Sequence, residues 1–136
     1  MKPLVVISQR LHADAIGLLS SLCDVALVNP RTEGSRRELR ELARGATALL
    51  AAGPLRVDDT LVYACRRLCI VACAYRMPEH IDISACTRRG VWVTNVFSRW
   101  LGKEAEIEAA RNVLDALSGD IPRCALNDVL PSAVAA

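Results

Sequence analysis

Several features are scarce in this sequence, and each scarcity narrows the range of functions. Only 4% of the 136 residues are aromatic, so a packed core must come mainly from Ala, Val, Leu and Ile. No apolar run approaches the roughly 20 residues of a membrane-spanning helix. The net charge of +2 is too small to indicate a nucleic-acid or acidic-membrane partner. The first apolar stretch, Leu4–Ile7, is too short for a signal peptide, so we expect a cytoplasmic protein with neither kind of partner.

The glycines also lack the arrangement that binds nucleotides. The seven glycines include no Gly-x-Gly pair, and there is no P-loop. Without backbone amides at a glycine turn, the pyrophosphate of a dinucleotide has no site on this chain. We therefore predict that this chain by itself binds no cofactor.

Cysteine, by contrast, is well represented, with six residues. Cys65, Cys69 and Cys73 are evenly spaced, but four residues of a strand span about 13 Å. Ligands of one metal ion each lie only about 2.3 Å from it, so this spacing does not favour a metal site. The two histidines, His12 and His80, do not stand at a zinc-site spacing from any cysteine. We expect buried, reduced thiols that act as small apolar core residues, and no metal.

Short apolar, β-branched runs alternate with segments of helical periodicity. We predict strands at residues 4–8, 25–28, 47–52, 69–74 and 91–94. We predict helices at residues 11–22, 35–45, 58–65, 83–89 and 104–117. Five strands with intervening helices imply a parallel sheet with right-handed crossovers. The predicted fold class is therefore α/β, a flavodoxin-like three-layer sandwich with a five-stranded parallel sheet of order 2-1-3-4-5.

The second predicted helix carries the densest run of charge in the sequence. Its charged residues alternate in sign: Arg36, Arg37, Glu38, Arg40, Glu41 and Arg44. Mixed charges at helical spacing are typical of a solvated helix face. We therefore interpret this segment as a solvated face and not as a binding patch.

Two separated parts of the chain carry motifs of one family. The first part includes Val5-Val6-Ile7, Ala85-Cys86-Thr87 and Arg89-Gly90-Val91-Trp92, and the second includes Glu106-Ile107-Glu108, Leu117-Ser118-Gly119 and Asn127 to Pro131. In these motifs the chain resembles the D-2-hydroxyacid dehydrogenases, and most closely the phosphite (phosphonate) dehydrogenases. The resemblance implies one half-domain, residues 1–136. Within it, residues 1–96 belong to the first lobe, 97–103 form a connector in place of the cofactor lobe, and 104–136 form the returning C-terminal helix and tail.

The resemblance also bears on the site residues. In the family the catalytic Arg, Glu and His lie on the cofactor lobe, so it implies no catalytic residue on this chain, which we predict not to be an enzyme. In the family's substrate loop, the position of the oxyanion-binding Lys is Arg76 here, and the next Gly is Met77. Glu79 and His80 replace an Asp and an Asn, while Asp82 is kept. Arg76 could hold a small oxyanion such as phosphite or a 2-keto acid, or it could simply be an exposed arginine.

The favoured function is a stand-alone, non-catalytic module related to these oxidoreductases. Four apolar residues, Val96, Phe97, Trp100 and Leu101, stand where the second lobe would cover the surface. Exposed apolar groups tend to find a partner, so we predict a homodimer through these residues. Two alternatives remain open. One is a small-oxyanion binding protein that uses Arg76, and the other is the substrate-lobe subunit of an oxidoreductase completed in trans.

Overall fold

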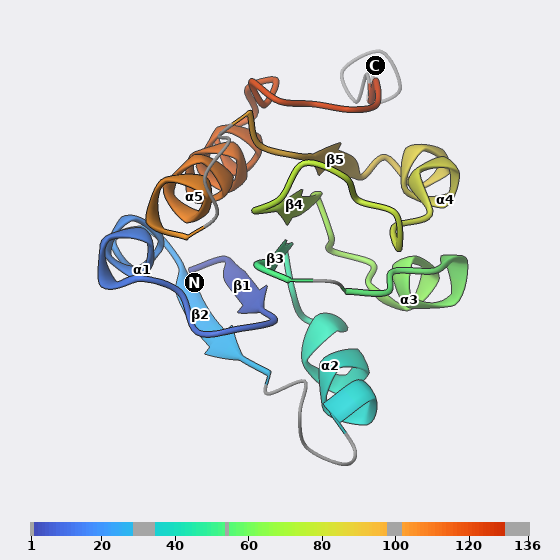
Figure 1. The fold of residues 1–136 in the computed structure, drawn as a ribbon. Helices are drawn as coiled ribbons and strands as arrows, with labels where there is room; N and C mark the ends of the chain where they lie inside the picture. Colours follow the sequence, from blue (N-terminus) through green and yellow to red (C-terminus); the bar gives the residue numbers. More distant parts are fainter. Residues whose placement is uncertain (1, 29–34, 54, 98–101, 130–136) are drawn as a thin grey trace.

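A computed structural model describes residues 2–28, 35–53, 55–97 and 102–129, and it contains a five-stranded, all-parallel sheet (Figure 1). The strands are β1 (Leu4–Ile7), β2 (Asp24–Leu27), β3 (Ala48–Ala51), β4 (Ile70–Cys73) and β5 (Trp92–Thr94). Their spatial order is β2-β1-β3-β4-β5. This confirms the predicted α/β fold and the predicted strand order.

Helices cover both faces of the sheet (Figure 1). Helices α1 (Ala13–Ser20) and α5 (Lys103–Leu117) lie side by side on one face. Helices α2 (Ser35–Ala43), α3 (Asp59–Ala64) and α4 (Ile83–Arg88) cover the other face. None of the helices in the described part of the chain has the length and apolarity that a membrane crossing requires.

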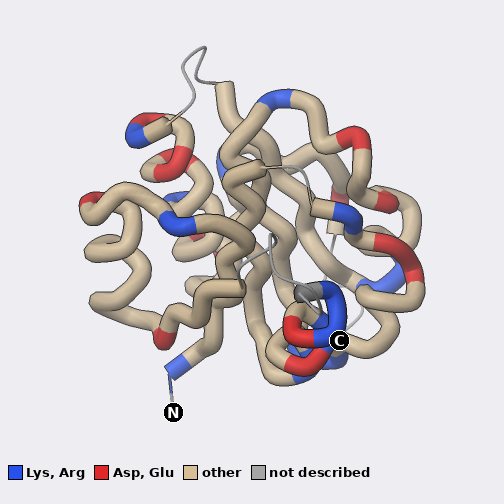
Figure 2. Tube along the Cα trace, turned by 60° about the horizontal axis from the view of Figure 1, so that its bottom comes forward, with Lys and Arg blue, Asp and Glu red and all other residues tan. Residues whose placement is uncertain are grey.

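Alternation along the strands divides the interior into two cores. Val5, Ile7 and Leu50 pack under α1 and α5, whereas Val6 and Leu49 pack under the three helices of the opposite face. Because helices cover both faces of the sheet, the strands are continuously apolar and do not alternate between apolar and polar residues. Charged residues of both signs lie around the periphery (Figure 2), and β1, β3 and β4 contain no charged residue.

The C-terminal segment protects the outer edge of β5. The Leu126 amide donates to the Val93 carbonyl at 2.7 Å. The Asn127 side chain accepts from the Val93 amide at 2.8 Å and donates to the Val91 carbonyl at 2.9 Å. The segment thus supplies hydrogen-bond partners that a sixth strand would otherwise provide.

All six cysteines are free thiols, and five of them are buried while Cys69 is half-buried. Burial raises the pKa of Cys65 and of Cys73 to about 11 and that of Cys86 to about 12. A thiol with such a pKa is almost entirely protonated near neutral pH and is therefore a poor nucleophile and metal ligand. This agrees with the predicted role of these residues as small apolar core groups.

Candidate functional site

The loops that follow the strands meet at one edge of the sheet, where ligands of such folds bind. The loop after β4 carries Arg76 and Met77, both exposed, with Met77 reaching 69%. Arg76 therefore stands just beyond the carboxyl end of a central strand with its guanidinium available to a ligand. Its planar fork suits a carboxylate or another small oxyanion.

A chain of side-chain amides fixes the backbone at Arg76. The Arg76 carbonyl accepts from Asn95 Nδ2 at 3.0 Å. Asn95 follows β5, and its own carbonyl accepts from Nδ2 of Asn112, a residue of α5 that is 2% exposed, at 3.2 Å. Sequence reasoning missed both asparagines. The sequence does contain one sign of this contact, because Asn112 is a polar residue directly beside the apolar residues of the last helix.

The far side of the loop is held by the segment that precedes α3. The Val57 amide donates to the His80 carbonyl at 2.9 Å, and the Asp82 amide donates to the Val57 carbonyl at 2.8 Å. Asp82 also caps α4, because its Oδ1 accepts from the Ala85 amide at 2.9 Å. Among the described residues, positive φ values occur only at glycines, so the turn at Met77 does not need the left-handed conformation. The loop thus keeps a regular backbone although the expected glycine is replaced.

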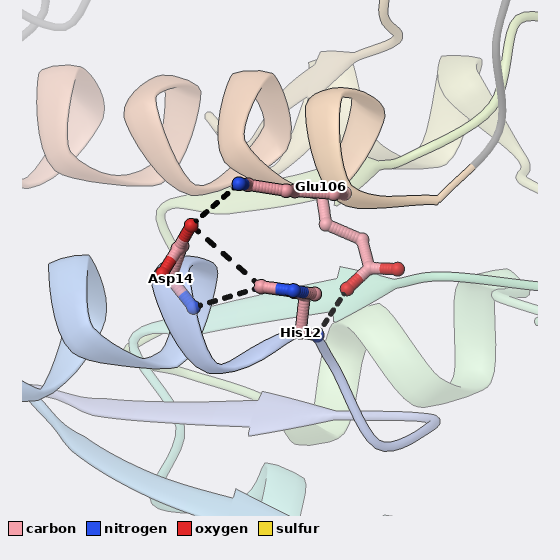
Figure 3. A network of polar contacts seen from close by, with 4 residues as sticks. His12, Asp14 and Glu106 are labelled. Atoms are coloured by element: carbon pink, nitrogen blue, oxygen red, sulfur yellow. Dashed lines mark hydrogen bonds and ion pairs between the residues drawn. The ribbon is translucent and has the colours of Figure 1, made fainter.

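A second polar network joins the N-termini of α1 and α5 (Figure 3). The His12 main-chain amide donates to Glu106 Oε1 at 2.5 Å, and His12 Nδ1 accepts from the Asp14 amide at 3.1 Å. Asp14 Oδ2 pairs with Lys103 Nζ at 2.9 Å. The hydrogen bond with Lys103 lowers the pKa of the Asp14 carboxyl, and the same contact raises the pKa of Lys103.

This network uses His12 to hold two helices together. His12 caps α1 through its Nδ1 atom and anchors α5 through its main chain. Glu106 lies 94 residues away in the sequence, so local spacing gave no sign of the contact. The network therefore stabilises the packing of α1 against α5 at their N-terminal ends.

The residues predicted to form a self-association surface do not share one environment. Val96 is 1% exposed and packs in the core under α5, so it is not part of any surface in this fold. Phe97 is 73% exposed, and its main-chain amide donates to Glu108 Oε2 at 3.1 Å. Trp100 and Leu101 lie outside the described residues. Of the four predicted residues, Phe97 is therefore the one that is exposed within the described part of the chain.

The turn after β1 does not offer the cradle that a dinucleotide would need. In that turn the Gln9 side chain lies against Gly53, where an added Cβ would collide with the Gln9 amide. The turn, Ser8-Gln9-Arg10, contains no glycine, whereas the dinucleotide site of such a fold has a glycine turn with free amides. Among the described ranges, no three His, Cys, Asp or Glu side chains come together as a metal site would require.

Comparison with known proteins identifies the family. The model of the "D-isomer specific 2-hydroxyacid dehydrogenase, catalytic domain" family matches residues 5–99. The glyoxylate reductase of Thermococcus onnurineus is 34% identical over 95 residues, which cover 70% of this chain and 28% of that protein. The glyoxylate reductase of Aeropyrum pernix is 31% identical over 121 residues, which cover 85% of this chain and 36% of that protein. This chain thus spans about a third or less of the length of these relatives.

Solved structures agree on the fold. The PH0520 protein of Pyrococcus horikoshii superposes with a TM-score of 0.63 at 22% identity, over 71% of this chain and 28% of that one. A 2-hydroxyacid dehydrogenase of Ketogulonicigenium vulgare superposes with a TM-score of 0.59 at 21% identity, over 72% of this chain and 30% of that one. At these identities the superpositions show a shared fold and no more.

One prediction is corrected by these comparisons. We predicted that the chain is not an enzyme, because the resemblance assigned the catalytic residues to a lobe outside it. The relatives that it matches at 31–34% identity are reductases, so that prediction is wrong. The absence of the family's catalytic Arg, Glu and His from these residues is not evidence against enzymatic activity. The chain belongs to the D-isomer specific 2-hydroxyacid dehydrogenases, whose catalytic domain it matches over most of its length.

Proposed function

We propose that residues 1–136 form the substrate-binding lobe of an oxidoreductase that acts on a small 2-oxo acid, and that a separate lobe binds the dinucleotide. Glyoxylate is the first substrate to test, because the curated relatives are glyoxylate reductases. The turn after β1 does not fit a dinucleotide. The role of these residues is therefore to bind and orient the 2-oxo acid.

The position of Arg76 is the observation that carries this proposal. Arg76 is exposed directly after β4, at the edge where parallel sheets bind their ligands. Its guanidinium can donate two parallel hydrogen bonds to the two oxygens of a carboxylate. The Asn95 hydrogen bond to its carbonyl restrains the backbone, which reduces the ordering that binding would otherwise require. Phosphite, which also presents two oxygens in this way, is the second ligand to test.

An arginine at the other end of β4 provides a matched control for Arg76. Arg67 is also exposed but precedes β4, and it lies at the opposite edge of the sheet. We expect glyoxylate to bind the unaltered chain saturably by calorimetry. Arg76→Gln should weaken binding by about tenfold, the value of one charge-assisted pair, and Arg67→Gln should leave it unchanged. Equal effects of the two substitutions would show a diffuse charge effect and would remove Arg76 from the site.

The assignment to an oxidoreductase has its own test. The tagged chain should be purified from its native cells, and the eluate assayed for glyoxylate reduction with NADH and with NADPH. We expect activity to follow the tagged chain through gel filtration and to fall strongly in Arg76→Gln. An eluate without reductase activity, together with no glyoxylate binding by the chain, would contradict the proposal.

Self-association is a second candidate property, and exposed Phe97 is the observation that favours it. We propose that the surface around Phe97 pairs with a second copy when no other lobe covers it. Light scattering after gel filtration should then give a dimer that Phe97→Glu converts to a monomer. Leu126→Glu, at a residue that is 41% exposed on the C-terminal segment, is the control and should leave the dimer intact. A monomer in the unaltered chain would contradict this property.

A further inference from the structure

Three arginines line a small pocket between α2 and α3 that the candidate site does not use. Arg36 and Arg40 belong to α2, and Arg56 belongs to the segment before α3. The pocket has a volume of about 220 Å³, and Asp58 and Thr60 also line it. Pockets for drug-sized ligands usually measure about 300–1,000 Å³, so this one suits a small ion or a single substituent group.

The local carboxylates do not balance these arginines. Asp58 is the one acidic residue in the lining, and its Oδ1 accepts from the Leu61 amide at 2.9 Å to cap α3. The neighbouring Asp59 pairs with Arg88 of α4 at 3.7 Å. Within the described ranges, no ion pair joins a carboxylate to Arg36, Arg40 or Arg56. The pocket thus carries three positive charges against one negative charge.

The spacing along α2 adds to this imbalance. Arg36 and Arg40 are four residues apart, so their side chains are neighbours and like charges there are destabilising. Inside α2 neither has an acidic residue three or four positions away, whereas Arg37 has Glu41 four positions on. The sequence pattern indicated a solvated face because it combines the charges from all sides of the helix. In the fold only one side of α2 faces α3, and the charged residues on that side, Arg36 and Arg40, are both positive.

We propose that this pocket binds a phosphate group, either as the free ion or as part of a small phosphate monoester. Arginine forks match the geometry of phosphate oxygens, and a bound dianion would remove the repulsion between Arg36 and Arg40. The Thr60 hydroxyl supplies a further donor at the pocket wall. The site is distinct from Arg76, because none of the residues that line this pocket belongs to the loop that carries Arg76.

Calorimetry with inorganic phosphate and with glycerol phosphate, at constant ionic strength in chloride, tests the proposal. We expect saturable binding that Arg40→Gln weakens by about tenfold or more. Arg37→Gln makes the same charge change on the same helix outside the pocket, and it should alter the Kd less than twofold. Arg76→Gln should also have no effect, which separates this site from the proposed function. Tighter binding of the ester would identify the ligand as a monoester, and tighter binding of the ion would identify free phosphate.

A stability measurement distinguishes binding from a purely structural role. Without phosphate, Arg40→Gln should keep or raise the Tm because it removes a like-charge neighbour. Phosphate should raise the Tm of the unaltered chain and of Arg37→Gln more than that of Arg40→Gln. If Arg40→Gln fails to fold by circular dichroism, Arg56→Gln, which lies outside any helix, provides the same comparison. Absence of saturable binding at millimolar phosphate, or an equal loss in Arg37→Gln, would overturn the proposal.

Discussion

The two faces of the sheet are built in different ways. The α1–α5 face joins segments from opposite ends of the chain, and polar contacts link His12 to Glu106 and Asp14 to Lys103. The α2–α3–α4 face is assembled from successive strand–helix units, and its helices are short. The first face therefore depends on closing a long loop of chain, whose entropic cost its contacts must offset. The second face depends on contacts between units adjacent in the sequence, and it leaves three arginines unbalanced between two of its helices.

The largest expected difference between the faces concerns truncation of the two neighbouring leucines of β3. Leu50 packs under α1 and α5, Leu49 packs on the opposite face, and each is 0% exposed. We expect Leu50→Ala to lower the free energy of unfolding by about 4 kcal/mol and Leu49→Ala by about 3 kcal/mol. The reason is that short α3 and α4 can relax into a cavity more readily than long α5 can.

Urea denaturation followed by circular dichroism measures both values, with the unaltered chain as reference. The reverse order, or a cost below about 1 kcal/mol for either residue, would contradict this account of the two cores.

A smaller effect is expected where the C-terminal segment links β5 to α4. Asn127 bonds the Val93 amide and the Val91 carbonyl on β5 and also donates to Thr87 Oγ1 of α4 at 3.0 Å. Asn127→Ala should cost about 2 kcal/mol, because the Val93 amide loses its partner at the sheet edge.

The exposed neighbour provides the control, and Asp128→Ala should stay within about 0.5 kcal/mol of the unaltered chain. Hydrogen exchange should show faster exchange of the Val93 amide in Asn127→Ala. Unchanged exchange at Val93 would mean that this edge is protected by something other than the Asn127 side chain.

The smallest effect is expected for the exposed ion pair between Asp14 and Lys103. The pKa of Asp14 is lowered below its ordinary value of 3.8, so its contribution is present above that value and is lost as the pH falls through the folded-state pKa. The pKa of Lys103 is raised above 10.5, so its contribution persists at neutral pH and is lost only as the pH rises beyond that value.

Asp14→Asn should therefore lower the Tm slightly between about pH 5 and 9, and the difference should vanish near about pH 2 and in high salt. Asp120→Asn, at an exposed residue after α5, should leave the Tm unchanged across the same range. A Tm difference in Asp14→Asn that does not change with pH would indicate that the substitution acts through the α1 cap and not through the ion pair.

Much of the fold could be predicted from local patterns. The apolar runs of β1, β3 and β4 and the helical spacing of α5 appear directly in the sequence, and the alternation of strands and helices implies a parallel sheet. Each end of the predicted strands lies within one residue of the corresponding end in the structure. The position of Arg76 beyond β4 followed from the same alternation, because parallel strands end at one common edge.

The sequence by itself determined which residues are apolar, how they are spaced, and hence the layers and the strand order. Tertiary structure decided which polar groups meet. It pairs Asn95 with the Arg76 carbonyl and His12 with Glu106, it buries Val96, and it brings Arg56 to the two arginines of α2. A periodic pattern records which face of an element avoids water, but it contains no information about the polar partner that lies across that face. That partner is fixed only when segments distant in the sequence pack together.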